Sequence, residues 1–346
     1  MKMDKYNIDY HKLHFHPKRV SEWLEGEKIF PIYAEISLTS ACNFRCVWCG
    51  PNFFLNYKPE YIETDVIKMT LTNMADVGVK AVMFGGEGEG TLHKDFAEIV
   101  KHAKESGLDV ALTTNGLLYT KKLATKTLQY LSWIKFSLDS CNAETYARLH
   151  GTKKENIKIV FDNIIHAVQL RNSTGCDCTI GGQAILLKDN LNSIIPLVRF
   201  LKTVKADYLA IKPFSEHEKR IGDELELPTL EDIEKLKVEL SKEDFNVIFR
   251  DMAFSNLDRE RCYYKCYAQD FCAYINTLGG VSSCINFIGD DKFCYGNIYE
   301  DTFENIWINK KEIKPNLNRC REICRLDSSN RYLWDLKHPH PHVNFI

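Results

Sequence analysis

Three cysteines, Cys42, Cys46 and Cys49, are the group in this sequence best suited to chemistry, because only three and two residues separate them. Thiolates at this spacing can ligate three irons of a cubane iron–sulfur cluster and leave the fourth iron open to another ligand. A zinc site is the alternative, but zinc usually takes four protein ligands in two pairs, and no second pair lies nearby in the sequence. The triplet therefore favours a cluster with one open iron.

Further polar residues follow the next apolar runs of the sequence. Because the carboxyl ends of parallel strands meet at one edge of a sheet, residues at these positions would share a rim with the cysteines. They are Gly85, Gly86 and Glu87 after residues 81–84, Asn115 after residues 110–114, and Ser137 and Asp139 at the end of residues 134–138.

The elements that would position these residues are six apolar runs that alternate with helical patterns between about residues 31 and 214. Such alternation indicates a parallel sheet covered by helices, and right-handed crossovers curl the sheet toward a barrel. The sequence therefore predicts an α/β fold with a partial (β/α)6 barrel. The expected strands are residues 32–38, 81–84, 110–114, 134–138, 179–187 and 208–211, and the expected helices are residues 65–77, 93–105, 121–131, 157–170 and 193–204.

The composition changes after residue 214, where a polar segment precedes a helical pattern at 230–240 and a Cys-rich, aromatic-rich region. In that region two short apolar runs, 273–277 and 281–284, flank Gly279 and Gly280, a hairpin signal. We expect an N-terminal extension at 1–30, the partial barrel at 31–214, a linker and helix at 215–254, and a small Cys-rich C-terminal α+β domain at 255–346.

The cysteine triplet, with Trp48 directly before Cys49, resembles the signature of the radical S-adenosylmethionine (radical SAM) enzymes, and the resemblance covers roughly residues 31–214. It implies a [4Fe-4S] cluster on Cys42, Cys46 and Cys49, whose open iron chelates the amino and carboxylate groups of S-adenosylmethionine. One electron would then cleave this cofactor to methionine and a 5′-deoxyadenosyl radical. A flavodoxin- or ferredoxin-type protein is the expected electron donor.

The same resemblance implies positions for the cofactor. Gly85, Gly86 and Glu87 are similar to the Gly-Gly-Glu that holds the methionine ammonium, although the family often continues with Pro where this chain has Gly88, which suggests a more mobile loop. The remaining candidates each have a plainer alternative. They are Asn115, which is equally a turn residue; Ser137 and Asp139, of which Asp139 is also a candidate cap for a helix near residue 143; and Arg148, which also suits a solvated helix face.

Lys212 lies in an otherwise apolar run at the end of the sixth expected strand. A lysine is costly to bury without a partner. Lys212 is therefore a candidate catalytic residue, for substrate binding or proton transfer.

Four C-terminal cysteines, Cys266, Cys284, Cys320 and Cys324, resemble the ligands of the SPASM and Twitch domains, which carry auxiliary [4Fe-4S] clusters. No cysteine follows Cys324, so the resemblance favours the single-cluster Twitch type. The last pair is separated by three residues where two are commoner, so one ligand stays open. Cys262, Cys272 and Cys294 compete for that place, and a structural zinc site is the alternative to a cluster.

The composition limits the class of protein. The 346 residues include 45 Lys and Arg against 47 Asp and Glu, a net charge of −2, without a basic block suited to nucleic acid. No apolar stretch reaches the roughly 20 residues of a membrane span. The N-terminus lacks the apolar core of a secretory signal, so we expect a cytoplasmic protein, in which 13 cysteines are not a disulfide framework.

The expected partner is a small-molecule or peptide substrate. The segment 324–345 also resembles members of the family associated with surface-polysaccharide synthesis, and this favours oxidation of a sugar-like or aminocyclitol carbinol, in polysaccharide or secondary-metabolite synthesis. The alternatives are a peptide-modifying maturase, a redox-neutral epimerase and a non-enzymatic iron–sulfur electron carrier.

Overall fold

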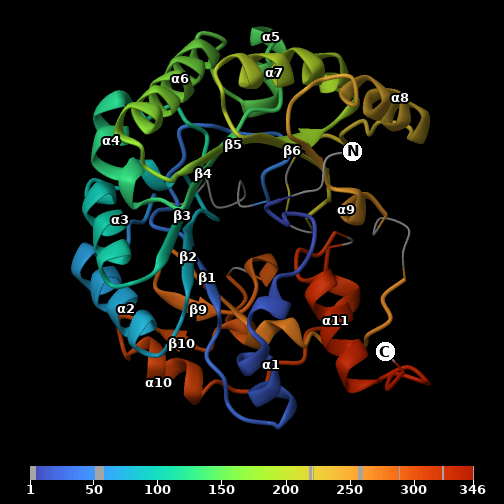
Figure 1. The fold of residues 1–346 in the computed structure, drawn as a ribbon. Coiled ribbons are helices and arrows are strands. Elements are labelled where there is room, and N and C mark those ends of the chain that lie inside the picture. Colours follow the sequence, from blue (N-terminus) through green and yellow to red (C-terminus); the bar gives the residue numbers. More distant parts are fainter. Residues whose placement is uncertain are drawn as a thin grey trace.

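The computed structural model describes residues 5–50, 58–217, 220, 222–255, 260–287, 289–321 and 323–345. They form an α/β fold in which one sheet curls into an open barrel with helices on its convex side (Figure 1). Ten strands are hydrogen-bonded in the order β10-β9-β8-β1-β2-β3-β4-β5-β6-β7. The expected α/β partial barrel is confirmed.

The six expected strands are the centre of this sheet, and each pairs in parallel with the next. They are β1 (Tyr33–Ile36), β2 (Ala81–Phe84), β3 (Asp109–Thr114), β4 (Trp133–Ser137), β5 (Thr179–Leu186) and β6 (Tyr208–Pro213). The helices between them are α2 (Thr64–Asp76), α3 (Phe96–Glu105), α4 (Lys121–Thr127), α5 (Ala143–His150), α6 (Asn156–Thr174) and α7 (Leu191–Thr203).

The strands present different residues to their two faces. Ile36, Phe84 and Phe136 pack with helix residues such as Ile67 and Ile99 in the main core. Because side chains alternate along a strand, the neighbouring positions point to the concave face. The strands thus bury one apolar face under the helices and line the inside of the barrel, its lumen, with the other.

The sheet extends beyond the six expected strands on both sides. A seventh parallel strand, β7 (Val247–Phe249), follows α8 (Leu230–Leu240) and pairs with β6. On the other side β8 (Cys272–Ile275) pairs in parallel with β1, and the hairpin of β8 with β9 (Gly280–Ser282) turns at Gly279, whose φ is +83°. The Cys-rich segment therefore continues the sheet of the barrel.

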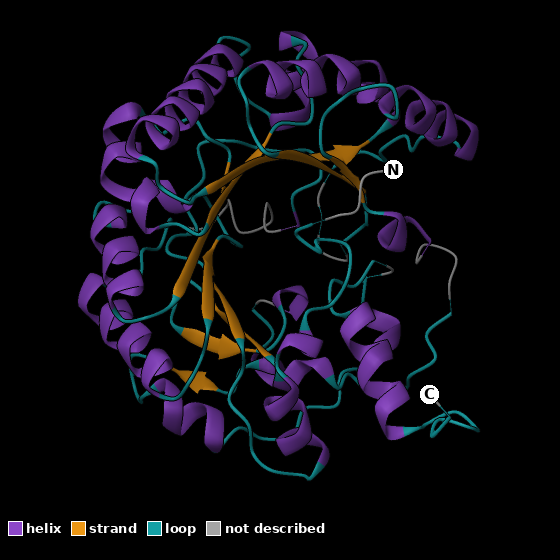
Figure 2. Cartoon of the chain, in the orientation of Figure 1, coloured by secondary structure: helices purple, strands orange, loops and turns teal. Residues whose placement is uncertain are grey.

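The chain ends pack against each other. Residues of α1 (Pro17–Leu24) form an apolar cluster with Phe271 and with Leu333 of α11 (Asp327–Lys337), and these helices lie side by side at the open side of the barrel (Figure 2). The expected boundary at 255 borders residues 256–259, which lie outside the described residues. The remaining elements are α9 (Asp251–Ser255), β10 (Gly296–Asn297) and α10 (Phe303–Ile308).

No helix in the described parts of the chain combines the length and the apolar character needed to cross a membrane.

Candidate active site

The loop that carries the cysteine triplet is held by backbone hydrogen bonds from two neighbouring parts of the rim. The Arg45 and Val47 amides donate to the carbonyls of His150 and Leu149 at the end of α5, over 2.9 and 3.0 Å. From the other side, the Glu89 amide donates to the Ala41 carbonyl over 2.8 Å. The loop is therefore fixed between α5 and the loop that follows β2.

Two glycines allow this close approach. Gly88 and Gly151 have φ of +59° and +54°, and a Cβ at either would clash with backbone of the cysteine loop, at Thr39 and Arg45 respectively. Gly88, expected to make its loop more mobile, instead packs the loop tightly against the cysteine loop. Only glycine adopts this backbone at such short separation without strain.

The three thiols of the triplet lie close enough to affect one another. Burial raises the pKa of Cys42 to about 12 and that of Cys46 well above its ordinary value, and charge on Cys49 raises both further. Among the described residues no three His, Cys, Asp or Glu side chains converge on a single ion position.

The Gly-Gly-Glu loop is held in place by residues that the sequence analysis missed. The Ser37 hydroxyl accepts from the Glu87 amide over 2.8 Å and donates to the Gly85 carbonyl over 3.0 Å. The Glu87 carboxylate, 5% exposed, accepts from the Thr277 amide over 3.0 Å and from the Tyr274 hydroxyl over 3.3 Å. The C-terminal segment thus fixes the loop after β2 directly.

The same packing leaves no room for a side chain at Gly86. Its φ is +95°, and an added Cβ would lie 2.5 Å from Ser37 Oγ and 3.0 Å from the Tyr274 ring. Protein atoms therefore already occupy the space beside Gly86. Burial raises the pKa of Glu87, whereas the Thr277 amide lowers it.

Asn115 connects β3 to the cysteine loop. Its side-chain Nδ2 donates to Asn43 Oδ1 over 2.6 Å, and its backbone amide donates to Glu89 Oε2 over 2.8 Å. The Asn43 Nδ2, beside Cys42, is buried and has no partner among the described residues. This orphaned donor is a polar group that a bound cofactor could satisfy.

Asp139 is buried and does not cap α5. Its Oδ1 accepts from the Ile185 amide over 2.5 Å, and its Oδ2 lies 3.1 Å from His150 Nε2. His150 Nδ1 is in turn 3.4 Å from Cys46 Sγ. The cap of α5 is Asn142, whose side chain accepts from the Thr145 amide, so the capping alternative for Asp139 is wrong.

Ser137 and Arg148 have different positions. Ser137 lies on the concave face of β4, opposite Gln183 of β5. Arg148 is more than half exposed and pairs with Asp189 over 2.6 Å. None of the contacts described for Arg148 involves another candidate residue, which matches the plainer expectation of a solvated helix face.

Lys212 lies on the concave face of β6, with Lys135 of β4 also directed into the lumen. Burial lowers the pKa of Lys212 to about 7, and the charge of Lys135 lowers it further. Sequence analysis missed Lys135, although a charged residue within the apolar run 134–138 was the same signal that identified Lys212.

The four C-terminal candidate cysteines lie close enough to raise one another's pKa. Burial raises the pKa of each of these thiols. In addition, charge on Cys324 raises the pKa of Cys266 and Cys320, and charge on Cys284 raises the pKa of Cys324. A group of buried thiols fits a metal cluster, which removes the protons and balances the charge.

The competing cysteines are placed differently. Cys262 and Cys294 are exposed. Cys272 is buried beside the four candidates, but its thiol donates to the carbonyls of Ala268 and Ser283, over 3.7 and 3.3 Å. Of the three, only Cys272 is buried beside this group.

Arg321 lies near both cysteine groups. Its pKa is lowered by burial, while charge on Cys324, Cys49 and Cys284 opposes that shift. Its guanidinium donates to the backbone carbonyls of Ser215 and Glu216. A fixed cation is therefore close to cysteines of both groups.

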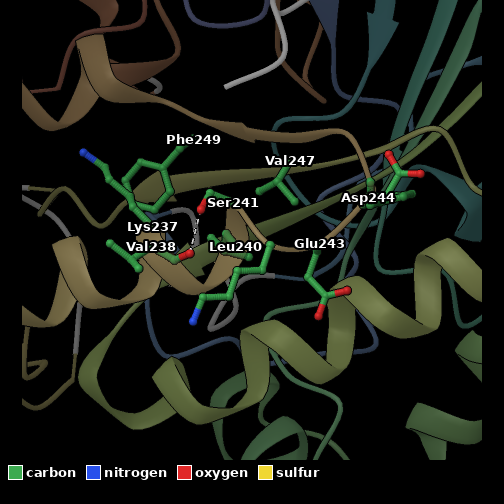
Figure 3. Close-up of a pocket in the computed structure, with 10 residues that line it drawn as sticks. Lys237, Val238, Leu240, Ser241, Glu243, Asp244, Val247 and Phe249 are labelled. Atoms are coloured by element: carbon green, nitrogen blue, oxygen red, sulfur yellow. Dashed lines mark hydrogen bonds between the residues drawn. The ribbon is translucent and has the colours of Figure 1, made fainter.

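A pocket of about 580 Å³ lies elsewhere, between α8 and β7 (Figure 3). Its charged groups are engaged in ion pairs, including Lys237 with Asp251 over 2.9 Å and Glu243 with Arg199 over 2.8 Å. None of its lining residues is a candidate from the sequence. We assign it no role in the chemistry.

Comparison with known proteins agrees with this fold. Residues 36–201, just under half of the chain, match the Radical SAM superfamily, so this part of the chain is a radical SAM domain. Domains of this superfamily use a [4Fe-4S] cluster and S-adenosylmethionine.

Individual relatives are more distant. A GTP 3′,8-cyclase of Limosilactobacillus fermentum is 38% identical over 142 residues, 40% of this chain and 42% of the cyclase, so this chain spans less than half of that relative. A Pyrococcus furiosus tungsten-containing aldehyde ferredoxin oxidoreductase cofactor-modifying protein is 23% identical over 300 residues, 81% of each chain.

Among solved structures, Streptococcus suis SuiB bound to S-adenosylmethionine has a TM-score of 0.65 at 22% identity, over 89% of this chain and 72% of SuiB. This likeness concerns the fold.

Proposed function

We propose that this protein cleaves S-adenosylmethionine reductively and uses the resulting radical to abstract hydrogen from a carbon of a substrate held in the barrel. The observation that carries the proposal is the cysteine loop, fixed at the rim between α5 and the loop that follows β2. An electron carrier would need the cysteines but not the Gly-Gly-Glu loop that Ser37 and Thr277 hold beside them.

Different residues of this chain would bind the cluster and the cofactor. Cys42, Cys46 and Cys49 would hold the cluster, and when bound it supplies the electron that cleaves S-adenosylmethionine to methionine and a 5′-deoxyadenosyl radical. The loop at Gly85 and Gly86, which Ser37 holds in place, would orient the methionine end of the cofactor. The buried Nδ2 of Asn43, which lacks a partner in the described structure, is a further donor beside the triplet.

Cys266, Cys284, Cys320 and Cys324 would hold one auxiliary [4Fe-4S] cluster. Their mutual electrostatic contact and burial support this assignment. A cluster there could accept the electron that a substrate radical must lose on oxidation, and cluster potentials vary widely with surroundings. This supports an oxidoreductase over an epimerase.

Fewer observations bear on the identity of the substrate. None of the relatives named above acts, by its name, on a free sugar, so only the sequence resemblance supports the sugar-like substrate. A peptide substrate is the alternative. We also propose a cytoplasmic location and a flavodoxin- or ferredoxin-type electron donor, for which the sequence is the only support.

The test is anaerobic reconstitution of the whole chain with iron and sulfide, followed by dithionite and S-adenosylmethionine. Wild type should release 5′-deoxyadenosine. A C42A/C46A/C49A variant should lose about four irons per chain and all cleavage. Cys176→Ala, outside both cysteine groups, is the matched control and should keep both. Cleavage by the triple variant would overturn the proposal.

A further inference from the structure

The lumen of the barrel is lined by an excess of cations. Lys135 of β4 and Lys212 of β6 point inward. Lys135 lowers the pKa of Lys212, and Arg250, which follows β7, lowers the pKa of both lysines. Arg325 also lowers the pKa of Lys135, and Arg321 lowers that of Lys212, whereas the carboxylates of Glu35 and Asp139 raise the pKa of Lys135 and Lys212 respectively. Three arginines from two other parts of the chain therefore lie near the two lysines.

Two of these cations have carboxylate partners. Arg325 pairs with Glu35 of β1, and Arg250 Nε lies 3.3 Å from Asp9 Oδ1. Arg321 is bound by backbone carbonyls. Of the five cations, only Lys135 and Lys212 have no such contact among the described residues.

Neither lysine has a carboxylate within ion-pair distance in the described part of the chain. The contact described for the Lys135 ammonium is with the Trp133 ring, 5.5 Å from its centroid. Burial lowers the pKa of Lys135 to about 8 and that of Lys212 to about 7. Two nearby ammonium groups with no carboxylate in direct contact are costly, and an anion between them would relieve that cost.

The position of the two lysines suits a substrate rather than a structural ion. Tyr6 and Ile8 pack against Tyr208 and Ala210, on the amino-terminal side of Lys212, and fill that end of the lumen. Lys212 thus faces the part of the lumen toward the carboxyl ends of the strands, where the cysteine loop lies, whereas Lys135 is level with Tyr208, deeper in the barrel. Neutral donors share this concave face: Thr113 is level with Lys135, and Ser137 is level with Gln183.

We propose that Lys135 and Lys212 bind an anionic group of the substrate, a phosphate or a carboxylate, inside the barrel. The inference rests on the proposed function, since it names the substrate class of the same site. The lysines would fix the anionic end of the substrate, and so determine which carbon faces the radical.

The test measures thermal unfolding of the reconstituted whole chain with phosphate, with succinate, and with chloride at matched ionic strength. The phosphate and succinate arms separate the two sources of the anion. At a hundredfold excess over Kd, a bound anion should raise the Tm by about 4 °C for a chain of this length. A K135M/K212M variant should lose this rise, and K135R/K212R should keep it.

Lys126→Met, on the exposed side of α4, is the matched control and should respond as wild type. The double Met variant should fold, because both side chains are only half-buried and removing two like charges relieves repulsion. No rise with either anion in wild type, or the same rise in the double Met variant, would overturn the inference.

The binding of S-adenosylmethionine separates this inference from the proposed function. If K135M/K212M binds and cleaves S-adenosylmethionine as wild type does, the proposed function holds whatever the anion result. If calorimetry shows at least a tenfold loss of S-adenosylmethionine affinity in that variant, the lysines bind the carboxylate of the cofactor, and the substrate assignment is wrong.

Discussion

Arg325, the residue after Cys324, forms an ion pair with Glu35 in the middle of β1. The contact joins the C-terminal cysteine group to the strand that leads into the cysteine triplet. Glu35 is buried at 3% exposure, whereas the Arg325 side chain keeps 40% of its surface accessible. The pair therefore couples the positions of the two cysteine groups through side chains as well as through the sheet.

Glu35→Gln should lower the free energy of unfolding by about 1–3 kcal/mol, because it leaves the Arg325 cation without its counter-ion in the lumen. Denaturant unfolding measures this change. Glu144→Gln removes an exposed pair with Lys154 and should cost under about 1 kcal/mol. Equal effects of the two substitutions would show that the Glu35 pair adds nothing specific.

Gly86→Ala should destabilise the protein by about 1–3 kcal/mol and weaken S-adenosylmethionine binding, since the new Cβ meets Ser37 at a strained φ. Gly90→Ala is the matched control, because its Cβ would meet Phe96 at an ordinary 3.7 Å. Thermal melts and calorimetry report both effects. A Gly86→Ala protein as stable as the Gly90→Ala protein would contradict this account.

Lys212 should make the stability of the protein depend on pH. Its folded pKa is lowered to about 7, mainly by burial, from an ordinary value of 10.5. Between these values the unfolded chain binds more protons, so this residue makes stability rise as pH increases from about 7 toward 10. Lys212→Met should flatten the rise in urea midpoints across that range, and Lys126→Met should not. An unchanged profile in Lys212→Met would contradict the shifted pKa.

Cys266→Ala combined with Cys284→Ala should reduce iron from about eight to about four per chain and leave S-adenosylmethionine cleavage intact. Cys294→Ala, at an exposed position, should keep all the iron. Iron analysis, with circular dichroism to check folding, measures the result. Zinc instead of iron in the C-terminal group, or full iron in the folded double variant, would rule out the auxiliary cluster.

The sequence was sufficient for elements with strong periodicity. The helix at 230–240 and the strand at 81–84 have the predicted bounds, because each is one uninterrupted apolar pattern. β7 was missed, since three residues carry too little pattern to identify a strand.

The pairing of β8 with β1 was also missed, because no local pattern encodes a contact between residues so far apart. For the same reason Thr277 and Tyr274 could not be identified as partners of Glu87. Candidates at strand ends were easier to find, because the rim of a parallel sheet is a property of the fold class.

The pairing of β1 with β8 also affects how the chain folds. Tyr33 is in register with Cys272, so this ladder closes a very long loop and adds contacts of high sequence separation. During synthesis β1 has only β2 as a neighbour until residue 275 has left the ribosome, and its other edge is open to incorrect pairing. The strand that precedes the cysteine triplet is therefore among the last to be completed, and cluster insertion is expected to follow synthesis of the C-terminal segment rather than accompany synthesis of the barrel.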